Sequence, residues 1–334
     1  MAYEVLTLDY ALGIDGGGSK CDAVLVARDG TVAGWGRGGP THPWYDSREV
    51  IAASFADAVT EALEGVRDAR LWVAGGFHSP DAWDVVRAAG EVVATLRAGE
   101  VQLALASAGE RWGMVVLAGT GSFVHVRTEQ GRERHVGGLG PVLGDYGSAY
   151  DIGLKGLRAA FASTWLESRR TSLMDAVPEA LGVEALPKVF DLVYHQQALS
   201  RRDIAALSRV VDREAEAGDD IAVRCVREAA DELADFAVEL VEELGMQDAD
   251  LPVIASGSVA QSSRLWWERV CERIAEVVPG MRAMIPRVRP AVGAALIALR
   301  EMGVETTPDL LDRIVQTQEE HLREIRAQAN ETTS

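Results

Sequence analysis

Two stretches of the chain share one order of elements, and this order constrains the fold more than any other sequence feature. In each stretch an apolar strand enters a loop of small residues, followed by a second strand, a turn and a third strand. The first covers residues 12–35 with a turn at Asp29-Gly30, and the second covers residues 114–138 with a turn at Gln130-Gly131. Asp-Gly supplies the turn geometry that a hairpin needs. The sequence therefore predicts two lobes that repeat one architecture without repeating their residues.

Helical periodicity follows each of these stretches. Helical patterns cover residues 49–66, 149–163, most of 173–246, 293–302 and 307–327, and short strands are expected at 69–74 and 251–255. Strand hairpins that alternate with helices predict an α/β protein. Because no linker rich in Pro, Gly or Ser separates the lobes, we expect a ligand cleft between them. The expected domains are residues 1–112 joined by the helix 293–304, residues 113–292, and a tail helix with a frayed end over 305–334.

Composition excludes several classes of function. The chain of 334 residues has a formal net charge of −18, the wrong sign for a nucleic-acid-binding surface. No apolar run approaches the roughly 20 residues of a membrane helix, and the first residues do not resemble a signal peptide. Three cysteines without paired spacing favour a reducing cytoplasm over a disulfide framework. The histidines show no metal-binding spacing.

The first small-residue loop is the sharpest local motif. It consists of Asp15, Gly16, Gly17, Gly18, Ser19 and Lys20. Three glycines let backbone N–H groups approach an anion, and Ser and Lys add donors. No helix follows, so the loop is neither a Walker loop nor a dinucleotide fingerprint. A plain tight hairpin is the alternative to phosphate binding.

Three further segments carry small residues at similar places. The second loop, Gly119-Thr120-Gly121-Ser122, again follows an apolar strand, although a simple β-turn would also explain it. The segment 137–148 places Asp145 among glycines before a helix, as a ligand or as part of a helix cap. The segment 252–263 would let a purine ring lie against its backbone, and an ordinary strand–helix turn is the alternative.

These motifs together resemble one known family. The order GIDGGGSK, AGTGS, GGLGPVLGDYGSAYDIG, SGSVAQS and PRVRPAVGAAL resembles the N-acetylglucosamine kinase group of the BadF/BadG/BcrA/BcrD ATPase family, in the actin-like ATPase and hexokinase superfamily. The likeness spans residues 12–302. It implies two ribonuclease-H-like lobes with ATP in the cleft between them, a small sugar as substrate, Mg²⁺ as cofactor, and a homodimer.

The resemblance also implies roles for individual residues. The loop of residues 16–20 would hold the β- and γ-phosphates, with Asp15 near Mg²⁺ through water, and the loop of residues 119–122 would hold them from the other lobe. Gly257 and Ser258 would line the adenosine pocket. The sugar would meet a set of residues from two loops: Thr41, His42, Trp44, Gly138, Leu139, Gly140 and Asp145.

The sequence departs from the family pattern at the sugar face. The family's catalytic Asp, about twenty residues before the second loop, corresponds in spacing to Glu100. The family's Asn is His42, its Trp is Leu139 and its Glu is Tyr146. Because the phosphate loops are kept and the sugar face is changed, we infer either an altered substrate or reduced catalysis. A sugar- and ATP-binding sensor is therefore the main alternative to a kinase. An ATPase that activates a dehydratase is a weaker alternative, since Cys225 and Cys271 lack a recognisable cluster setting.

Overall fold

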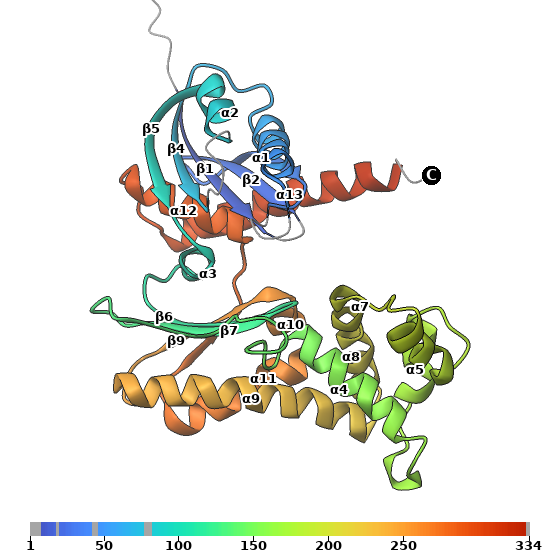
Figure 1. Cartoon of the computed structure of the whole chain (residues 1–334). Helices are drawn as coiled ribbons and strands as arrows, with labels where there is room; N and C mark the ends of the chain where they lie inside the picture. Colours follow the sequence, from blue (N-terminus) through green and yellow to red (C-terminus); the bar gives the residue numbers. More distant parts are fainter. Residues whose placement is uncertain (1–7, 18–19, 42–45, 77–81, 332–334) are drawn as a thin grey trace, which may run out of the picture. The chain divides into compact units, whose positions relative to one another are not determined.

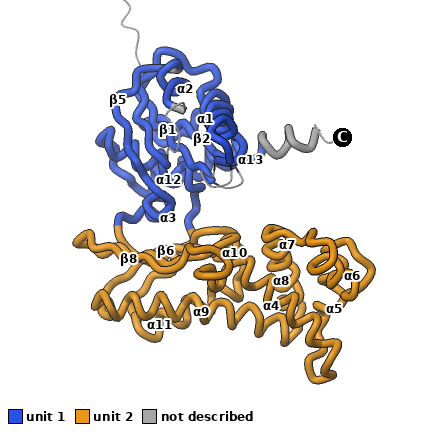
Figure 2. The backbone as a smooth tube through the Cα atoms, in the orientation of Figure 1, with its two compact units in different colours: residues 1–111, 286–334 blue, residues 112–285 orange. Residues whose placement is uncertain are grey.

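The structure, a computed structural model, describes residues 8–17, 20–41, 46–76 and 82–331. The chain forms two compact units, one of residues 1–111 and 286–334 and one of residues 112–285 (Figure 2). Each unit has its own five-stranded sheet and its own helices (Figure 1). We refer to them as unit 1 and unit 2.

The sheet of unit 1 has the strand order β3-β2-β1-β4-β5. Its strands are β1 (Asp9–Gly16), β2 (Cys21–Ala27), β3 (Val32–Gly38), β4 (Ala69–Gly75) and β5 (Gly90–Arg97). The first three strands are antiparallel neighbours, whereas β4 runs parallel to β1 and β5 runs parallel to β4. The predicted hairpin, with its turn at Gly30 (φ +88°), is confirmed.

The sheet of unit 2 repeats this topology, with the order β10-β9-β6-β7-β8. Its strands are β6 (Gly113–Ala118), β7 (Ser122–Arg127), β8 (Glu133–Gly137), β9 (Pro252–Ser256) and β10 (Arg282–Met284). Again three strands are antiparallel neighbours, whereas β9 runs parallel to β6 and β10 runs parallel to β9. The two sheets match strand for strand, which confirms the predicted architectural repeat.

The helices differ in number between the units. Unit 1 contains α1 (Arg48–Ala62), α2 (Ala82–Ala89), α3 (Glu100–Ser107), α12 (Pro290–Glu301) and α13 (Pro308–Glu331). Unit 2 contains α4 (Ala149–Ala162), η1 (Glu167–Arg169), α5 (Leu173–Ala180), α6 (Leu186–Phe190), η2 (Asp191–His195), α7 (Arg201–Ala206), α8 (Ser208–Glu216), α9 (Asp220–Leu244), α10 (Gly257–Ser262) and α11 (Arg264–Val277). Most of the unit 2 helices lie between β8 and β9, in the region that the sequence predicts to be helical.

Glycines let the unit 1 helices lie directly on the sheet. A Cβ on Gly36 would lie 1.9 Å from the carbonyl oxygen of Ala58 in α1. A Cβ on Gly13 of β1 would lie 2.0 Å from the carbonyl oxygen of Ala291 in α12. Since real Cβ atoms do not approach backbone this closely, these positions cannot carry a side chain without moving a helix. The strands that flank the glycine loop between β1 and β2 are thus held by close packing of α1 and α12 on the sheet.

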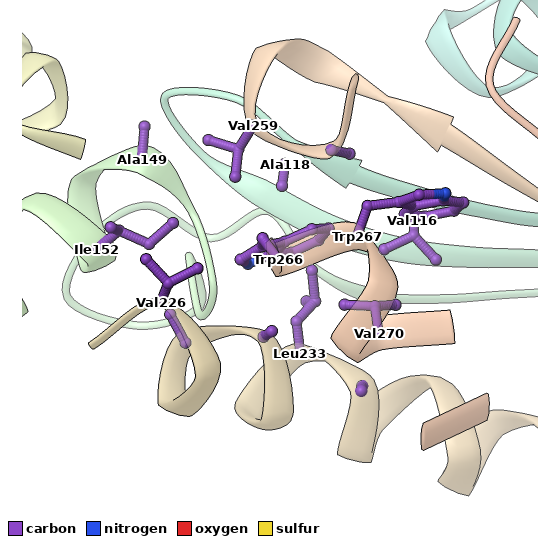
Figure 3. Packing of buried hydrophobic residues seen from close by; sticks show 14 of the residues in the cluster. Val116, Ala118, Ala149, Ile152, Val226, Leu233, Val259, Trp266, Trp267 and Val270 are labelled. Carbon is purple, nitrogen blue, oxygen red and sulfur yellow. The ribbon is translucent and has the colours of Figure 1, made fainter. Parts of the chain in front are cut away.

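The core of unit 2 lies between its sheet and its long helices. The residue Ala118, which precedes the second glycine loop, is fully buried together with Trp266 of α11. Figure 3 shows Trp266 and Trp267 between the strand that carries Val116 and the helix that carries Leu233. The second glycine loop therefore begins at a strand end that is held by tight packing on a buried tryptophan layer.

The C-terminal helix is part of unit 1, whereas we expected a separate tail. Ile314 and Leu322 of α13 are buried in the same cluster as α12. Gln318 is also buried, where its Oε1 accepts from Arg289 N at 2.8 Å. The structure therefore places the boundaries between the units after residues 111 and 285 and gives residues 308–331 a packing role.

Candidate functional site

The first glycine loop is closed by its own backbone and by Thr41. Gly17 N donates to Lys20 O at 2.9 Å, which joins the ends of β1 and β2. Thr41 N and Thr41 Oγ1 both donate to Gly17 O, at 2.9 and 3.3 Å. A Cβ on Gly16 would lie 2.5 Å from Thr41 Oγ1. Thr41, which we expected at the sugar, is buried and supports the glycine loop, and its contact with a sugar stays a prediction.

A buried carboxylate, Asp22, binds the cations next to this loop. It pairs with Lys20 Nζ and with Arg37 Nε, the latter at 2.7 Å. Although burial opposes ionisation, the hydrogen bonds from Arg37 and Lys20 hold the pKa of Asp22 below its usual range. Lys20, predicted to bind phosphate, thus forms an ion pair with Asp22 in this structure. The sequence signal for Asp22 is a single charged residue inside the apolar strand β2.

Asp15, at the end of β1, has the opposite electrostatic environment. Burial is the larger cause and the charge of Asp22 the second, and together they raise the pKa of Asp15 to about 6, against the lowering effect of Lys20. Asp15 pairs in register with Asp22 across the hairpin. Asp15 is a half-buried carboxylate with no ion pair among the residues that the structure describes, and such a group is well suited to interact with a metal-bound water.

Glu100 is the first residue of α3, after the N-cap Gly99. Its side chain keeps solvent-accessible surface, but the surrounding protein removes part of its hydration. This desolvation, and next the charge of Asp15, raise the pKa of Glu100 to about 7. The charge of Asp15, the candidate metal partner, thus acts on Glu100, the candidate base, within unit 1.

The second glycine loop joins β6 and β7 and is tied to the predicted sugar segment. Gly119 N donates to Gly121 O at 2.8 Å within the loop, and Thr120 is exposed. Ala149 N donates to Gly119 O at 2.8 Å, and Gly138 N donates to Ser122 O at 2.8 Å. The Ser122 hydroxyl donates to Tyr146 O at 2.5 Å. The segment 137–148 and the loop 119–122 therefore form one hydrogen-bonded structure.

The predicted sugar residues of unit 2 lie on this segment. Gly138 and Gly140 adopt φ values of +72° and +87°, which glycine adopts without strain. Leu139 is exposed, whereas the Asp145 side chain is only 3% exposed. Asp145 accepts from Arg201 Nη2 at 2.6 Å. The segment ends at Ser148, whose hydroxyl caps α4 by accepting from Asp151 N.

The predicted adenosine residues touch the second loop. Gly257 has φ +82°, and a Cβ there would lie 2.5 Å from Ala118 O. A Cβ on Gly119 would lie 3.9 Å from both Gly257 Cα and Ser258 N. Two glycine segments, far apart in the sequence, thus meet backbone to backbone in unit 2. Such bare backbone suits the close approach of a nucleotide.

Several predictions lie beyond the described geometry. Gly18, Ser19, His42 and Trp44 lie outside the described residues. Each glycine loop is described within its own unit, so a grip of both loops on one triphosphate stays a prediction. Among the described residues there is no group of three or more His, Cys, Asp or Glu side chains that could hold a metal ion by themselves. In the same residues no helix is long and apolar enough to cross a membrane.

Two sheets with the same strand order, each with a glycine loop after its first strand, define the class of ribonuclease-H-like, actin-like ATPases. The chain belongs to the BadF/BadG/BcrA/BcrD ATPase family, whose sequence profile matches residues 12–298.

Individual relatives agree with this family. An N-acetylmuramic acid/N-acetylglucosamine kinase of Clostridium acetobutylicum is 28% identical over 88% of this chain and 99% of its own. A solved structure from Chromobacterium violaceum, described as a candidate N-acetylglucosamine kinase, has a TM-score of 0.62 at 24% identity, over 87% of this chain and 99% of its own. A ROK family glucokinase from Streptomyces griseus, solved with glucose and AMPPNP, has a TM-score of 0.54 at 18% identity, over 86% and 98% of the two chains. The two structures show that the fold is shared.

Proposed function

We propose that this protein is an ATP-dependent kinase that phosphorylates a hydroxyl of an amino sugar of the N-acetylglucosamine type. The observation that carries the proposal is Glu100, a solvent-accessible carboxylate at the start of α3 whose pKa is raised to about 7. A base that titrates near neutral pH is suited to remove a proton from a hydroxyl under cellular conditions. The family membership and the names of the relatives support the kinase class and the sugar.

In the proposed reaction Glu100 accepts the proton of the sugar hydroxyl. The hydroxyl oxygen attacks the γ-phosphorus of ATP while the bond between that phosphorus and the bridging oxygen of ADP breaks. Positioning and electrostatic stabilisation carry most of the catalysis in such a transfer. Asp22 keeps Lys20 and Arg37 beside the first loop, where one of these cations would have to leave Asp22 to pair with a phosphate.

The backbone of the second loop supports the proposed binding of phosphate there. A Cβ on Gly121 would lie 2.9 Å from Asp145 Oδ1, so a side chain at this position would displace the loop or the carboxylate. Gly119 and Gly257 leave bare backbone next to each other, which supports the adenosine site at Gly257 and Ser258. Mg²⁺, when bound with ATP, would neutralise charge on the β- and γ-phosphates, and Asp15 would hold one of its waters.

The proposal extends to the assembly and the location of the protein. We propose a homodimer in the cytoplasm, supported by the family resemblance and by three free cysteines without a disulfide among the described residues. Light scattering on the purified protein tests the dimer, and a single monomeric mass across the micromolar range would contradict it.

The first test is ATP turnover with a panel of sugars in a coupled ADP assay with Mg²⁺. The panel contains N-acetylglucosamine, glucosamine, N-acetylmuramic acid and glucose, with EDTA as the metal control. We expect turnover with at least one amino sugar, and loss of at least a hundredfold in kcat in Glu100→Gln. Tight ATP binding without turnover on any of these sugars would refute the kinase.

A sensor that binds ATP and sugar without catalysis is the second candidate. The observation that favours it is the changed sugar face. There Leu139 is exposed, and the ring of Tyr146 packs on that of Phe236 with 5.3 Å between the ring centroids. Glu100→Gln separates the two candidates, because a sensor keeps its ligand affinity and has no turnover to lose.

A further inference from the structure

Asp145 is held between a loop and a helix that are far apart in the sequence. Its carboxylate is almost fully buried. Oδ1 lies 3.4 Å from Ser122 N, and a Cβ on Gly121 would come within 2.9 Å of it. Oδ2 accepts from Arg201 Nη2 at 2.6 Å. The carboxylate thus lies directly against the turn of the second glycine loop.

Arg201 is the cation that neutralises this carboxylate. Among the residues that the structure describes, it is the one cation recorded in an ion pair with Asp145. The next charged groups, Asp151, Lys155 and Glu232, line a cavity of about 220 Å³ beside Asp145 and pair with one another through Lys155. Lys155 is therefore already engaged by two carboxylates and does not replace Arg201.

The helix that carries Arg201 is fixed in position. Arg201 is the first residue of α7, and Ser200 and Asp203 form a capping box around it. Gly153 of α4 allows a close approach of α7, since a Cβ there would lie 1.9 Å from Ile204 O. Because α7 is capped and packs closely on α4, the backbone from which the Arg201 side chain extends is held in place. The Arg201 side chain is half-buried, and within the described part of the chain its buried Nε has no hydrogen-bond partner.

We propose that Arg201 is a positioning residue for the phosphate-transfer reaction. It holds the Asp145 carboxylate against Gly121 and Ser122 and so fixes both the second glycine loop and the adjacent sugar segment. This inference rests on the proposed kinase function and adds a residue from α7, outside all the glycine motifs. Ser122 is the common point, because it bonds Gly138, Asp145 and Tyr146 at once.

The test compares Arg201→Met and Arg201→Lys with the matched control Arg202→Gln, whose side chain is exposed on the same helix turn. A loop displaced by about 1 Å costs roughly a hundredfold in rate, so we expect Arg201→Met to lose ten- to a hundredfold in kcat/KM. Arg201→Lys keeps the charge without the planar fork and should recover part of the loss. Arg202→Gln should match the wild type.

A double-mutant cycle with Asp145→Asn separates positioning from general damage. If Arg201 acts through Asp145, Arg201→Met should cost little more in the Asp145→Asn background than Asp145→Asn costs alone. Fully additive losses would overturn the inference, as would wild-type kinetics of Arg201→Met in an active enzyme. Melting temperatures establish that each variant is folded.

Hydrogen–deuterium exchange tests the same inference without turnover. The peptide containing residues 119–122 should exchange faster in Arg201→Met than in the wild type or Arg202→Gln, because its loop loses the Asp145 contact. Unchanged exchange there would refute the inference even in a protein that phosphorylates no sugar. Failure of the whole sugar panel, by contrast, would refute the proposed function alone.

Discussion

Gly293 of α12 sets the position of the helix that carries the candidate base. A Cβ at this position would lie 2.5 Å from Leu103 O and 2.3 Å from Ser107 Oγ, both on α3. The Ser107 hydroxyl would lose its hydrogen bond to Leu103 O, of 2.7 Å, if it rotated away, and the Leu103 carbonyl belongs to the helix backbone. Since ordinary Cβ contacts begin near 3.4 Å, Gly293→Ala requires α3 to move by roughly 1 Å.

Two opposing terms decide the effect of Gly293→Ala on stability. Alanine favours the helix over glycine by about 1 kcal/mol. Overpacking typically costs about 1–3 kcal/mol. The expected net loss in the free energy of unfolding is therefore small, about 0–2 kcal/mol. Activity has no such compensation, because a shift of about 1 Å at Glu100 costs roughly a hundredfold in rate.

The assay is kcat for sugar phosphorylation beside a urea unfolding curve. We expect kcat to fall about a hundredfold in Gly293→Ala while the protein stays folded. Glu301→Ala, on an exposed position of α12, is the matched control and should behave as the wild type. Full activity of Gly293→Ala would refute the reasoning, because it would mean that the spacing of α12 and α3 does not determine where Glu100 lies.

Three further predictions concern the pKa values and the C-terminal helix. The raised pKa of Glu100 predicts a fall of kcat/KM below about pH 7. A carboxyl group with a raised pKa stabilises the fold fully below its unfolded pKa near 4.5, and this stabilisation is lost as the pH rises through 7. The melting temperature of Glu100→Gln should therefore exceed that of the wild type by an amount that grows from pH 5 to 8. A constant difference would contradict this. The lowered pKa of Asp22 has the opposite sign, so the stability that Asp22→Asn loses at pH 7, about 1–3 kcal/mol, should shrink as the pH falls below 4; an unchanged loss at pH 3.5 would contradict the ion pairs. Removal of residues 308–334 exposes the site that Ile314 and Leu322 cover and should cost roughly 3–6 kcal/mol in urea unfolding; an unchanged free energy of unfolding would contradict this packing role.

The parts of the fold that the sequence predicts are those with a local signal. The two hairpins have apolar strands and glycine turns, and α9 has an Asp219 cap, a long apolar stripe and a Gly245 end. The strand β5 and the helix α3 had no such signal. The stretch 90–107 is rich in Ala, Val and Leu and contains no Asn-Gly or Asp-Gly pair, and β5 alternates exposed with half-buried positions. Its strand and helix are fixed by packing on β4 and α12.

The candidate site divides in the same way. The glycine loops follow from the order of the motifs along the chain, and Glu100 follows from the family resemblance, at the spacing of the family's Asp. Asp22 and Arg201 do not, because their roles depend on partners that only the fold brings near them. Arg201 and Asp145 are 56 residues apart, and no pattern near either residue announces the pair. The docking of α13 on β3 is similarly invisible in the sequence, although the helix itself is predicted.

The carboxylates Asp15, Asp22 and Glu100 of unit 1 differ in role because the nearby cations pair with Asp22. Asp22 takes Lys20 and Arg37, which stabilises its charged form. Within the described residues, neither Asp15 nor Glu100 has a recorded ion pair, and burial raises both of their pKa values. Environments that push the pKa values of neighbouring carboxylates apart assign them different chemistry. In this fold the ion pairs of Asp22 lower its pKa and favour its charged form, whereas the pKa values of Asp15 and Glu100 are raised to about 6 and about 7, so that Glu100 is the one closest to neutral pH.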